Sequence, residues 1–272
     1  MSASVSRRTF LGIAGGAASI LGLAACGGNN NADSGDDTNA ASDGDASDKT
    51  YLVATDTTFA PFEFTNDAGE FVGIDVDLLA AIAADQGFKY ELNSLGFDAA
   101  VAALESNQAD AVIAGMSITP KRQKDYDFTD SYYQSSVCMA VKSGSDIKGL
   151  EDLKGQKVAG KTGTQSLDWA ESIKDEYGFE ITYFDTSDMM YQDVQTGNSV
   201  ACFEDTPVME YGVAQGNGLE IVAKEEDEFA SPYGLAVMKG KNPELIEMFN
   251  AGLANIKESG EYDEILAKYL EA

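Results

Sequence analysis

The sequence predicts an α/β fold with crossover helices, and two observations support this prediction. From residue 50 onward, short runs of apolar and β-branched residues alternate with longer segments whose apolar residues recur at helical spacing. This alternation is typical of a sheet whose strands are connected by helices. The chain has 272 residues, of which 44% are apolar, so it can form one large or two modest globular domains.

The expected elements begin with a strand at 51–55 and a helix at 75–86. In that helix Leu78 and Ile82 lie on one apolar face, and Gly87 ends it. Further strands are expected, with helices between them, at 90–95, 111–114, 137–141, 156–159, 181–184 and 199–203.

Two helical patterns close the chain. Asn242 is expected to cap the first helix, Pro243 to open it and Gly260 to end it. The apolar stripe of the first helix comprises Leu245, Phe249, Leu253 and Ile256, and that of the second comprises Tyr262, Ile265, Leu266 and Tyr269.

Composition excludes several function classes. Asp and Glu total 46 against 18 Lys and Arg, so the formal charge is −28 at pH 7 and the chain would repel a nucleic acid. There is no histidine, which removes the commonest general base and the usual zinc and haem ligands. Three cysteines are too few and too dispersed for a zinc ribbon or a disulfide framework. We therefore expect no nucleic-acid partner, no metal and no cofactor.

Residues 1–25 have the layout of a secretory signal peptide. Arg7 and Arg8 are their only charges, and the apolar run that follows, 10–25, contains four glycines. A membrane-spanning helix normally needs about 20 apolar residues, so we expect export rather than permanent insertion. The segment 6–11 resembles a twin-arginine signal, and an ordinary secretory signal with a basic start is the alternative.

A lipid attachment site is expected directly after the signal. The segment LAAC (23–26) resembles the lipobox of bacterial lipoproteins, which implies cleavage before Cys26 and a lipid on its thiol. Residues 27–48 contain no aromatic or branched aliphatic residue and cannot form a core. We expect 26–49 to be a flexible tether that holds a folded domain to the outer face of the cytoplasmic membrane.

From residue 51 to the C-terminus, the chain carries six dispersed motifs in order. They are ATDTTFAPFEF (54–64), VGIDVDL (72–78), AGMSITPKR (114–122), DFT (127–129), GTQS (163–166) and EDTP (204–207). These motifs resemble those of the polar amino-acid substrate-binding proteins of ABC importers, solute-binding protein family 3, and most closely those of its glutamine-binding members. The resemblance implies a protein without enzymatic activity that binds a free amino acid and delivers it to a membrane permease and its ATPase.

The resemblance also implies the architecture. The family has a two-lobed periplasmic-binding-protein-like fold of type II, in which two hinge strands join two α/β lobes that close on a ligand in the cleft. In this sequence, lobe 1 would comprise 50–132 and 233–272, and lobe 2 would comprise 136–229. We expect a monomer.

A free amino acid presents a carboxylate, an ammonium and a side chain, so its site needs a cation, an anion and a shaped slot. By resemblance, Arg122 grips the α-carboxylate with two parallel hydrogen bonds. It is expected on the first turn of a helix that Thr119 caps and Pro120 opens. Thr164 and Gln165, after a glycine turn at a helix start, resemble further partners of this carboxylate. The alternative for Arg122 is a solvated surface charge.

The α-ammonium and the aliphatic stem of the ligand have expected partners as well. Asp205 resembles the carboxylate that receives the ammonium, helped by the Gly115 carbonyl and the Ser117 hydroxyl. The alternative role for Asp205 is to cap the helix that follows it, and both roles are compatible. Phe59 and Phe97 match the two aromatic residues that enclose the stem, with ordinary core packing as their alternative.

The identity of the ligand depends on three residues expected at its distal end, Asp56, Lys161 and Glu204. In the glutamine-binding protein the first two are also Asp and Lys, whereas Glu204 replaces a histidine. A glutamine amide offers an acceptor for Lys161 and a donor for the carboxylates. With Glu204 included the site has one net negative charge, which disfavours glutamate. We therefore rank glutamine first, a basic amino acid second and glutamate third.

Two alternatives remain open at this stage. A cyclohexadienyl dehydratase-like enzyme on the same fold would use Glu204 as a general acid. The residues expected to bind a free amino acid favour binding without catalysis. Cys138 and Cys202 could form a disulfide in an exported protein or stay buried as free thiols.

Overall fold

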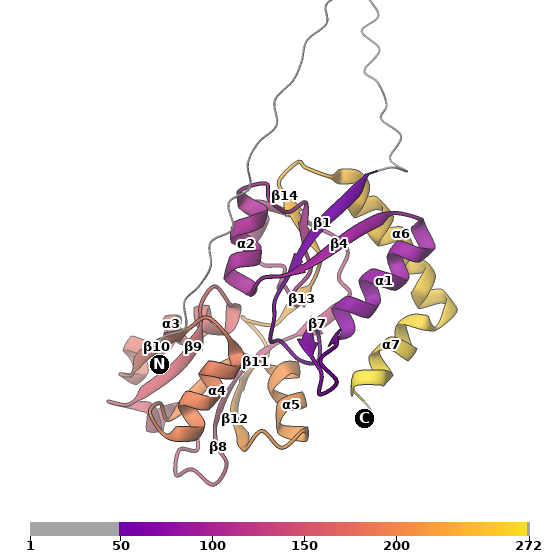
Figure 1. Ribbon diagram of the computed structural model, residues 1–272. Coiled ribbons are helices and arrows are strands. Elements are labelled where there is room, and N and C mark those ends of the chain that lie inside the picture. The colour runs from indigo at the N-terminus through magenta and orange to yellow at the C-terminus, as the bar shows by residue number, and fades with distance from the viewer. Residues whose placement is uncertain (1–48, 271–272) are drawn as a thin grey trace, which may run out of the picture. The chain divides into compact units, whose positions relative to one another are not determined.

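The computed structural model describes residues 49–270, which belong to one compact unit. The predicted signal peptide, the lipid attachment at Cys26 and almost all of the tether lie outside the described residues. Within 49–270, no helix is both long enough and apolar enough to span a membrane. The expected two-lobed α/β fold is confirmed, with two five-stranded sheets that each carry helices on both faces (Figure 1).

The first sheet has five strands and four covering helices. Their bounds are β1 (Thr50–Thr55), β4 (Lys89–Ser94), β5 (Ala111–Val112), β6 (Tyr126–Phe128), β14 (Ala236–Met238), α1 (Ile74–Gln86), α2 (Phe97–Glu105), α6 (Pro243–Ser259) and α7 (Glu261–Leu270). The spatial order is β4-β1-β5-β14-β6, with β1 parallel to β4 and β5, and β14 antiparallel to β5 and β6. Successive residues of β1 face opposite sides, so Val53 packs towards α1, α6 and α7, whereas Ala54 packs towards α2.

The second sheet has the same number of strands and three covering helices. Their bounds are β8 (Val137–Lys142), β9 (Lys157–Lys161), β10 (Glu180–Phe184), β11 (Ala201–Asp205), β12 (Leu219–Glu225), α3 (Gln165–Tyr177), α4 (Ser187–Thr196) and α5 (Thr206–Ala214). The spatial order is β10-β9-β11-β8-β12, in which β10, β9 and β11 run parallel and β8 is antiparallel to both of its neighbours. Trp169 of α3 packs on one face, and Met190 of α4 and Met209 of α5 pack on the other.

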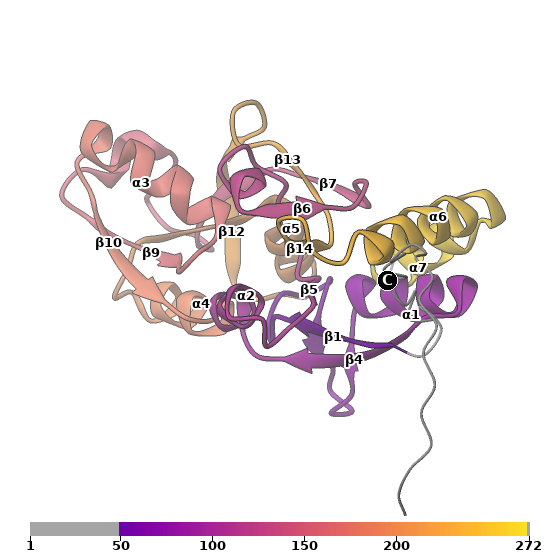
Figure 2. The same cartoon turned by 90° about the horizontal axis from the view of Figure 1, so that it is seen from above.

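Two short strands link the sheets. The strands β7 (Tyr133–Ser135) and β13 (Ser231–Tyr233) form an antiparallel pair between the two sheets (Figure 2). The chain leaves the first sheet through β7 and returns to it through β13, because β7 precedes β8 and β13 follows β12. The remaining elements are the hairpin strands β2 (Phe64–Thr65) and β3 (Phe71–Val72) and the 3₁₀ helices η2 (Arg122–Lys124) and η3 (Leu150–Leu153).

Three strand predictions differ from the structure by two residues at one or both ends. The strand expected at 156–159 is β9, which ends at Lys161. The strand expected at 111–114 stops at Val112, three residues before Gly115, which adopts a positive φ of 52°. The strand expected at 199–203 is displaced and ends at Asp205, because its last two residues pair with Cys138 and Val137 of β8.

The helix expected after Pro120 is a single 3₁₀ turn, η2. The Thr119 hydroxyl accepts a hydrogen bond from the Arg122 N–H at 3.2 Å, as a capping residue would. Tyr126 already begins β6, so the turn cannot extend into an α-helix. The turn nevertheless places Arg122 at its start, as the sequence predicts.

The entry to α1 depends on a glycine. Gly73 has a φ of 144°, and a Cβ at this position would lie 2.0 Å from the Phe62 carbonyl oxygen. The matched control is Gly87, which also has a positive φ of 72° but has no atom within 4 Å of an added Cβ. We expect Gly87→Ala to lower the free energy of unfolding by about 1 kcal/mol, and Gly73→Ala to lower it by about 2 kcal/mol more. Urea unfolding measures both, and equal losses would contradict the steric explanation.

Candidate functional site

Three strands end at one cavity. Asp56 directly follows β1, Lys161 is the last residue of β9, and Asp205 is the last residue of β11. The carboxyl ends of strands in open α/β sheets are common places for ligands. The cavity is lined by Asp56, Phe59, Phe97, Ala114, Gly115, Ser117, Arg122, Lys161, Thr164, Gln165 and Asp205. The structure therefore brings together every residue expected to bind the ligand except Glu204, and it adds Ala114.

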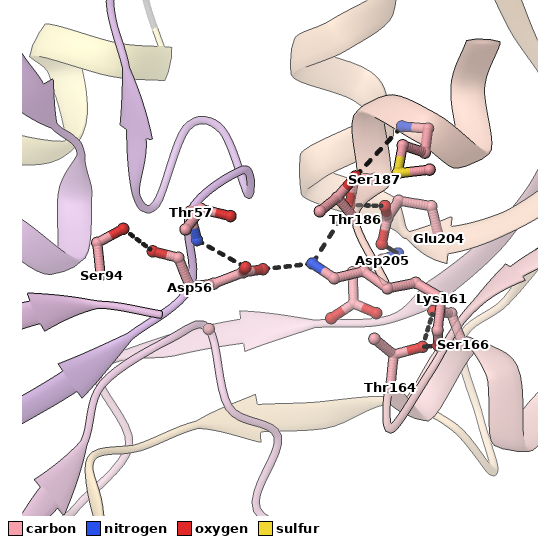
Figure 3. Close-up of polar contacts among 12 residues, drawn as sticks. Asp56, Thr57, Ser94, Lys161, Thr164, Ser166, Thr186, Ser187, Glu204 and Asp205 are labelled. Atoms are coloured by element: carbon pink, nitrogen blue, oxygen red, sulfur yellow. Dashed lines mark hydrogen bonds and ion pairs between the residues drawn. The ribbon is translucent and has the colours of Figure 1, made fainter. Parts of the chain in front are cut away.

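An ion pair forms part of the cavity wall. The Lys161 ammonium donates to Asp56 Oδ2, and both side chains are only 1% exposed (Figure 3). The second oxygen of Asp56 accepts from the Thr57 N–H at 2.6 Å, which fixes the carboxylate. Because the two side chains meet across the cavity, its free volume is about 10 Å³, room for roughly one water molecule.

Arg122 also joins the two sheets. Its guanidinium donates to the Ser117 carbonyl at 2.9 Å and to the Gly163 carbonyl at 3.0 Å, and lies 5.3 Å above the Phe97 ring. Burial lowers the pKa of Arg122, and the negative charge of Asp205 opposes this. A guanidinium stays charged in proteins, so the cavity wall keeps a cation at this position.

The N-terminus of α3 forms another part of the wall. The Thr164 hydroxyl accepts from the Leu167 N–H at 3.2 Å and donates to the Lys161 carbonyl at 2.7 Å, so Thr164 caps the helix. The Gln165 amide donates to the Ser231 hydroxyl on β13 at 2.8 Å. A capped helix start is electropositive, which suits a carboxylate.

Asp205 is the buried anion of the cavity. Its Oδ2 atom accepts a hydrogen bond of 2.5 Å from the hydroxyl of Tyr233 on β13, and the residue is only 4% exposed. Burial raises the pKa of Asp205 to about 7, helped by the neighbouring Glu204, whereas the Tyr233 hydroxyl and Arg122 act in the opposite direction. Asp205 precedes α5, as expected, but its side chain makes no capping hydrogen bond there.

Glu204 lies behind the cavity rather than in its wall. Successive residues of a strand point to opposite faces, so Glu204 points away from the side that Asp205 lines. Its Oε2 atom accepts from the Ser187 hydroxyl at 2.9 Å and from the Tyr191 hydroxyl at 2.8 Å, and its Oε1 accepts from the Asp205 N–H at 2.9 Å. Burial raises the pKa of Glu204, while nearby Lys161 lowers it.

The residues that hold Glu204 and Asp205 were not found from the sequence. Ser187 and Tyr191 lie on α4, and Ser187 also accepts a weak hydrogen bond of 3.4 Å from Lys161. Tyr233 lies on β13, far along the chain from Asp205. The sequence offers no signal for these partners beyond the hydroxyl groups of the three side chains, which do not by themselves indicate a partner.

The two phenylalanines of the wall serve the core and the cavity together. Phe59 is 4% exposed and Phe97 6% exposed, and each belongs to a hydrophobic cluster of the first sheet. The Lys161 ammonium lies 4.9 Å above the Phe59 ring. Cation–π contact therefore adds to the ion pair in holding Lys161.

The cysteines play no visible part in this site. Cys138 and Cys202 are buried free thiols on neighbouring strands. In the antiparallel register Cys138 faces Glu204 and Cys202 faces Ala140, so the two are not a directly opposed pair. Among residues 49–270, no group of three acidic or cysteine side chains is arranged to hold a metal ion.

Known proteins resemble the chain in both sequence and structure. A probable histidine-binding protein of Neisseria gonorrhoeae is 31% identical over 256 residues, which cover 93% of this chain and 92% of the relative. Substrate-binding domain 2 of GlnP from Lactococcus lactis, in an open conformation, is 45% identical, with 82% of this chain and 96% of that domain covered and a TM-score of 0.57.

An ancestral arginine-binding protein has been solved with two different ligands. Its arginine-bound structure is 39% identical, covers 81% of this chain and 97% of its own, and has a TM-score of 0.74. Its glutamine-bound structure is 38% identical, covers 82% of this chain and 98% of its own, and has the same TM-score of 0.74. A family model matches residues 51–272, and the chain therefore belongs to the bacterial extracellular solute-binding proteins, family 3.

Proposed function

We propose that this chain is the substrate-binding component of an ABC importer for a polar amino acid, most favourably glutamine. It captures the free amino acid between its two lobes and delivers it to a permease and its ATPase. A lipid on Cys26 holds it to the outer face of the cytoplasmic membrane. The observation that carries the choice of ligand is the Lys161–Asp56 ion pair in the cavity wall.

The α-groups of the ligand have complementary partners. Arg122 and the start of α3 offer a cation and an electropositive helix terminus for the carboxylate. Asp205, with the Ser117 side chain beside it in the wall, offers an anion for the ammonium. These partners recognise any free amino acid and do not discriminate between side chains.

The charge balance of the wall favours a neutral side chain. The wall contains two cations, Arg122 and Lys161, and two anions, Asp56 and Asp205. A zwitterion with an uncharged side chain keeps this balance. A glutamine amide can accept a hydrogen bond from Lys161 and donate one to Asp56, so both members of the ion pair would keep a polar partner.

Binding requires the lobes to separate and close again. A cavity of about 10 Å³ has no room for an amino acid, so the Lys161–Asp56 and Arg122–Gly163 contacts must open to admit it. The TM-score is higher with the ligand-bound ancestral protein than with the open GlnP domain, although the GlnP domain is more similar in sequence. This supports a closed arrangement in the present structure.

A basic amino acid is the second candidate. It is favoured by the neighbouring charge of Glu204 and by relatives whose names refer to histidine and arginine. The enzyme alternative loses its proposed acid, because Glu204 is outside the cavity wall. Capture without chemistry is therefore the function we propose.

The sign of the effect of Lys161→Met separates the two ligand classes. If glutamine is the ligand, this variant removes a charged hydrogen-bond donor and should weaken glutamine binding by about tenfold or more. If a basic amino acid is the ligand, the loss of a like charge should strengthen arginine or lysine binding. Isothermal calorimetry with glutamine, arginine and lysine distinguishes the two ligand classes. The control is Lys157→Met, because Lys157 is an exposed cation on the same strand.

Arg122→Ala should abolish tight binding. Loss of one partner of a buried charge pair costs roughly 3–5 kcal/mol, which is more than a hundredfold in affinity. The control is Lys121→Ala, which removes the neighbouring exposed cation paired with Asp168 and should change affinity by less than about twofold. A loss below about tenfold for Arg122→Ala, in folded protein, would remove Arg122 from the proposed site.

Affinity should decrease as the solution becomes acidic. The α-ammonium needs an ionised Asp205, whose pKa of about 7 means that the free protein increasingly holds a proton there below that pH. Binding must then release this proton, so Kd should rise by up to about tenfold per pH unit below the pKa.

The role of Asp205 in this pH dependence can be isolated. The Tyr233 hydroxyl lowers the pKa of Asp205, so Tyr233→Phe should shift the acid limb to higher pH. Calorimetry in buffers of different ionisation enthalpy measures the released proton. A Kd that stays constant from about pH 7 to about pH 5 would refute the assignment of Asp205.

A further inference from the structure

Two buried carboxyl groups, Glu63 and Asp75, lie behind the part of the cavity wall that contains Gly115 and do not line the cavity themselves. Glu63 follows the turn after β1, and Asp75 is in the first turn of α1; both residues are fully buried. The Asp75 N–H donates to the Phe62 carbonyl at 2.9 Å, which places Asp75 beside the residue that precedes Glu63, and each carboxyl group alters the pKa of the other. Asp75 Oδ2 accepts from the Gly115 N–H at 2.7 Å and from the Tyr132 hydroxyl at 2.8 Å.

Three oxygen atoms of this pair lack a conventional partner. Within residues 49–270, no N–H, hydroxyl or cationic group donates to Asp75 Oδ1 or to either carboxyl oxygen of Glu63. A buried polar atom without a hydrogen bond costs free energy, and two adjacent ionised carboxylates would also repel each other. A proton on one carboxyl group removes the repulsion, and it gives two of the three oxygen atoms a hydrogen-bond partner because it donates to the other carboxyl group.

We propose that Glu63 and Asp75 share one proton at neutral pH, with Glu63 as the donor and Asp75 as the acceptor, and that this pair positions the ligand site. Asp75 is the acceptor because the Gly115 N–H and the Tyr132 hydroxyl already stabilise its negative charge. Glu63 receives no such donor, so it is the group that keeps the proton.

Other charged groups near the pair favour this assignment. The negative charge of Asp56 raises the pKa of Glu63, and the positive charge of Lys161 lowers it. Burial raises the pKa of Glu63 well above its usual range, and the charges of Asp75 and Asp56 add to this. Burial also raises the pKa of Asp75, to about 7, although its hydrogen bonds act in the opposite direction. The hydroxyl of Tyr132 is the remaining titratable group in contact with the pair, and burial raises its pKa.

The pair reaches the ligand through Gly115. The hydrogen bond from the Gly115 N–H to Asp75 fixes the turn that contributes Gly115 and Ser117 to the cavity wall. The turn has no spare space, since a Cβ on Gly115 would lie 2.5 Å from the Phe59 ring. Glu63 and Asp75 are therefore positioning residues for the proposed ammonium partners, and this step rests on the proposed function.

Loss of the shared proton should weaken binding. When the pH is high enough to remove the proton, Glu63 and Asp75 are both negatively charged, and the charge of Asp56 adds to their repulsion. We expect this repulsion to displace the turn that carries Gly115. In Glu63→Gln the amide NH₂ replaces the shared proton as donor to Asp75 and cannot be titrated. This variant should keep the Kd within about threefold at neutral pH and lose the alkaline decrease in affinity.

Glu63→Leu should behave differently, because it leaves Asp75 Oδ1 without any donor. We expect it to weaken binding by about tenfold or more, measured by calorimetry with L-glutamine and L-arginine. The exposed Glu70→Gln on the neighbouring hairpin is the control and should change neither the affinity nor its pH dependence. Weak binding by Glu63→Gln, together with normal binding by Glu63→Leu, would overturn the proposal.

Infrared spectroscopy of the ligand-free protein tests the shared proton without any ligand. At about pH 8, where Asp205 is mostly ionised, the parent should show the carbonyl stretch of a protonated buried carboxyl group, and Glu63→Gln should lack it. Because burial also raises the pKa of Glu204, the decisive quantity is the difference between the two spectra, and identical carboxyl bands in the parent and in Glu63→Gln would overturn the proposal. This result does not depend on which amino acid binds, so failure of the proposed function and failure of the proton assignment can be told apart.

Discussion

The geometry of the cavity depends on the buried ion pair between Lys161 and Asp56. Each side chain is only 1% exposed, and a charge buried without a partner costs several kcal/mol, so neither could remain in the closed cavity alone. When the lobes separate, both charges regain water, and this recovered solvation offsets most of the Coulomb energy of the pair. The pair therefore fixes the geometry of closure without making closure strongly favourable. A ligand that supplies partners for both charges can then shift the equilibrium.

The two linking strands connect this cavity to the hinge. Tyr233 on β13 donates to Asp205 in the second sheet and accepts at 2.9 Å from the Ser135 hydroxyl on β7. Gln165, at the start of α3, donates to Ser231 on β13. The strands that must bend when the lobes move are thus hydrogen-bonded to residues of the cavity wall. A change in the charge of Asp205 would therefore alter the hydrogen bonds of the linking strands as well as the proposed contact with the ligand.

Local signals explain why much of the fold could be predicted. The helix expected at 75–86 is Ile74–Gln86, and the last long helix begins at Pro243 and ends before Gly260, because glycine and proline mark these ends in the sequence itself. Most residues of the cavity wall were expected there because the motifs that contain them resemble those of the family, and local pattern alone would not have identified them. Glu204 was misplaced because Ala201–Asp205 is buried throughout, so no polar alternation reveals which residues face the cavity. The proximity of Glu63 and Asp75 was not anticipated either, because it depends on how the segment before β2 packs against the start of α1.

The opposite orientations of Glu204 and Asp205 decide the electrostatics of the slot. Asp205 faces the cavity, where a ligand ammonium can neutralise it, whereas Glu204 is already held by the hydroxyl groups of Ser187 and Tyr191 and by a backbone N–H. Its negative charge is stabilised by these donors, so it does not need a cationic ligand. Lys161 in turn is satisfied by Asp56. A cationic side chain could enter only if Lys161 turned away from Asp56 towards Glu204, which would break the ion pair and disturb the hydrogen bonds of Glu204. We therefore propose that the slot accepts a neutral, polar side chain without rearrangement, whereas a basic side chain would require the buried charges to move.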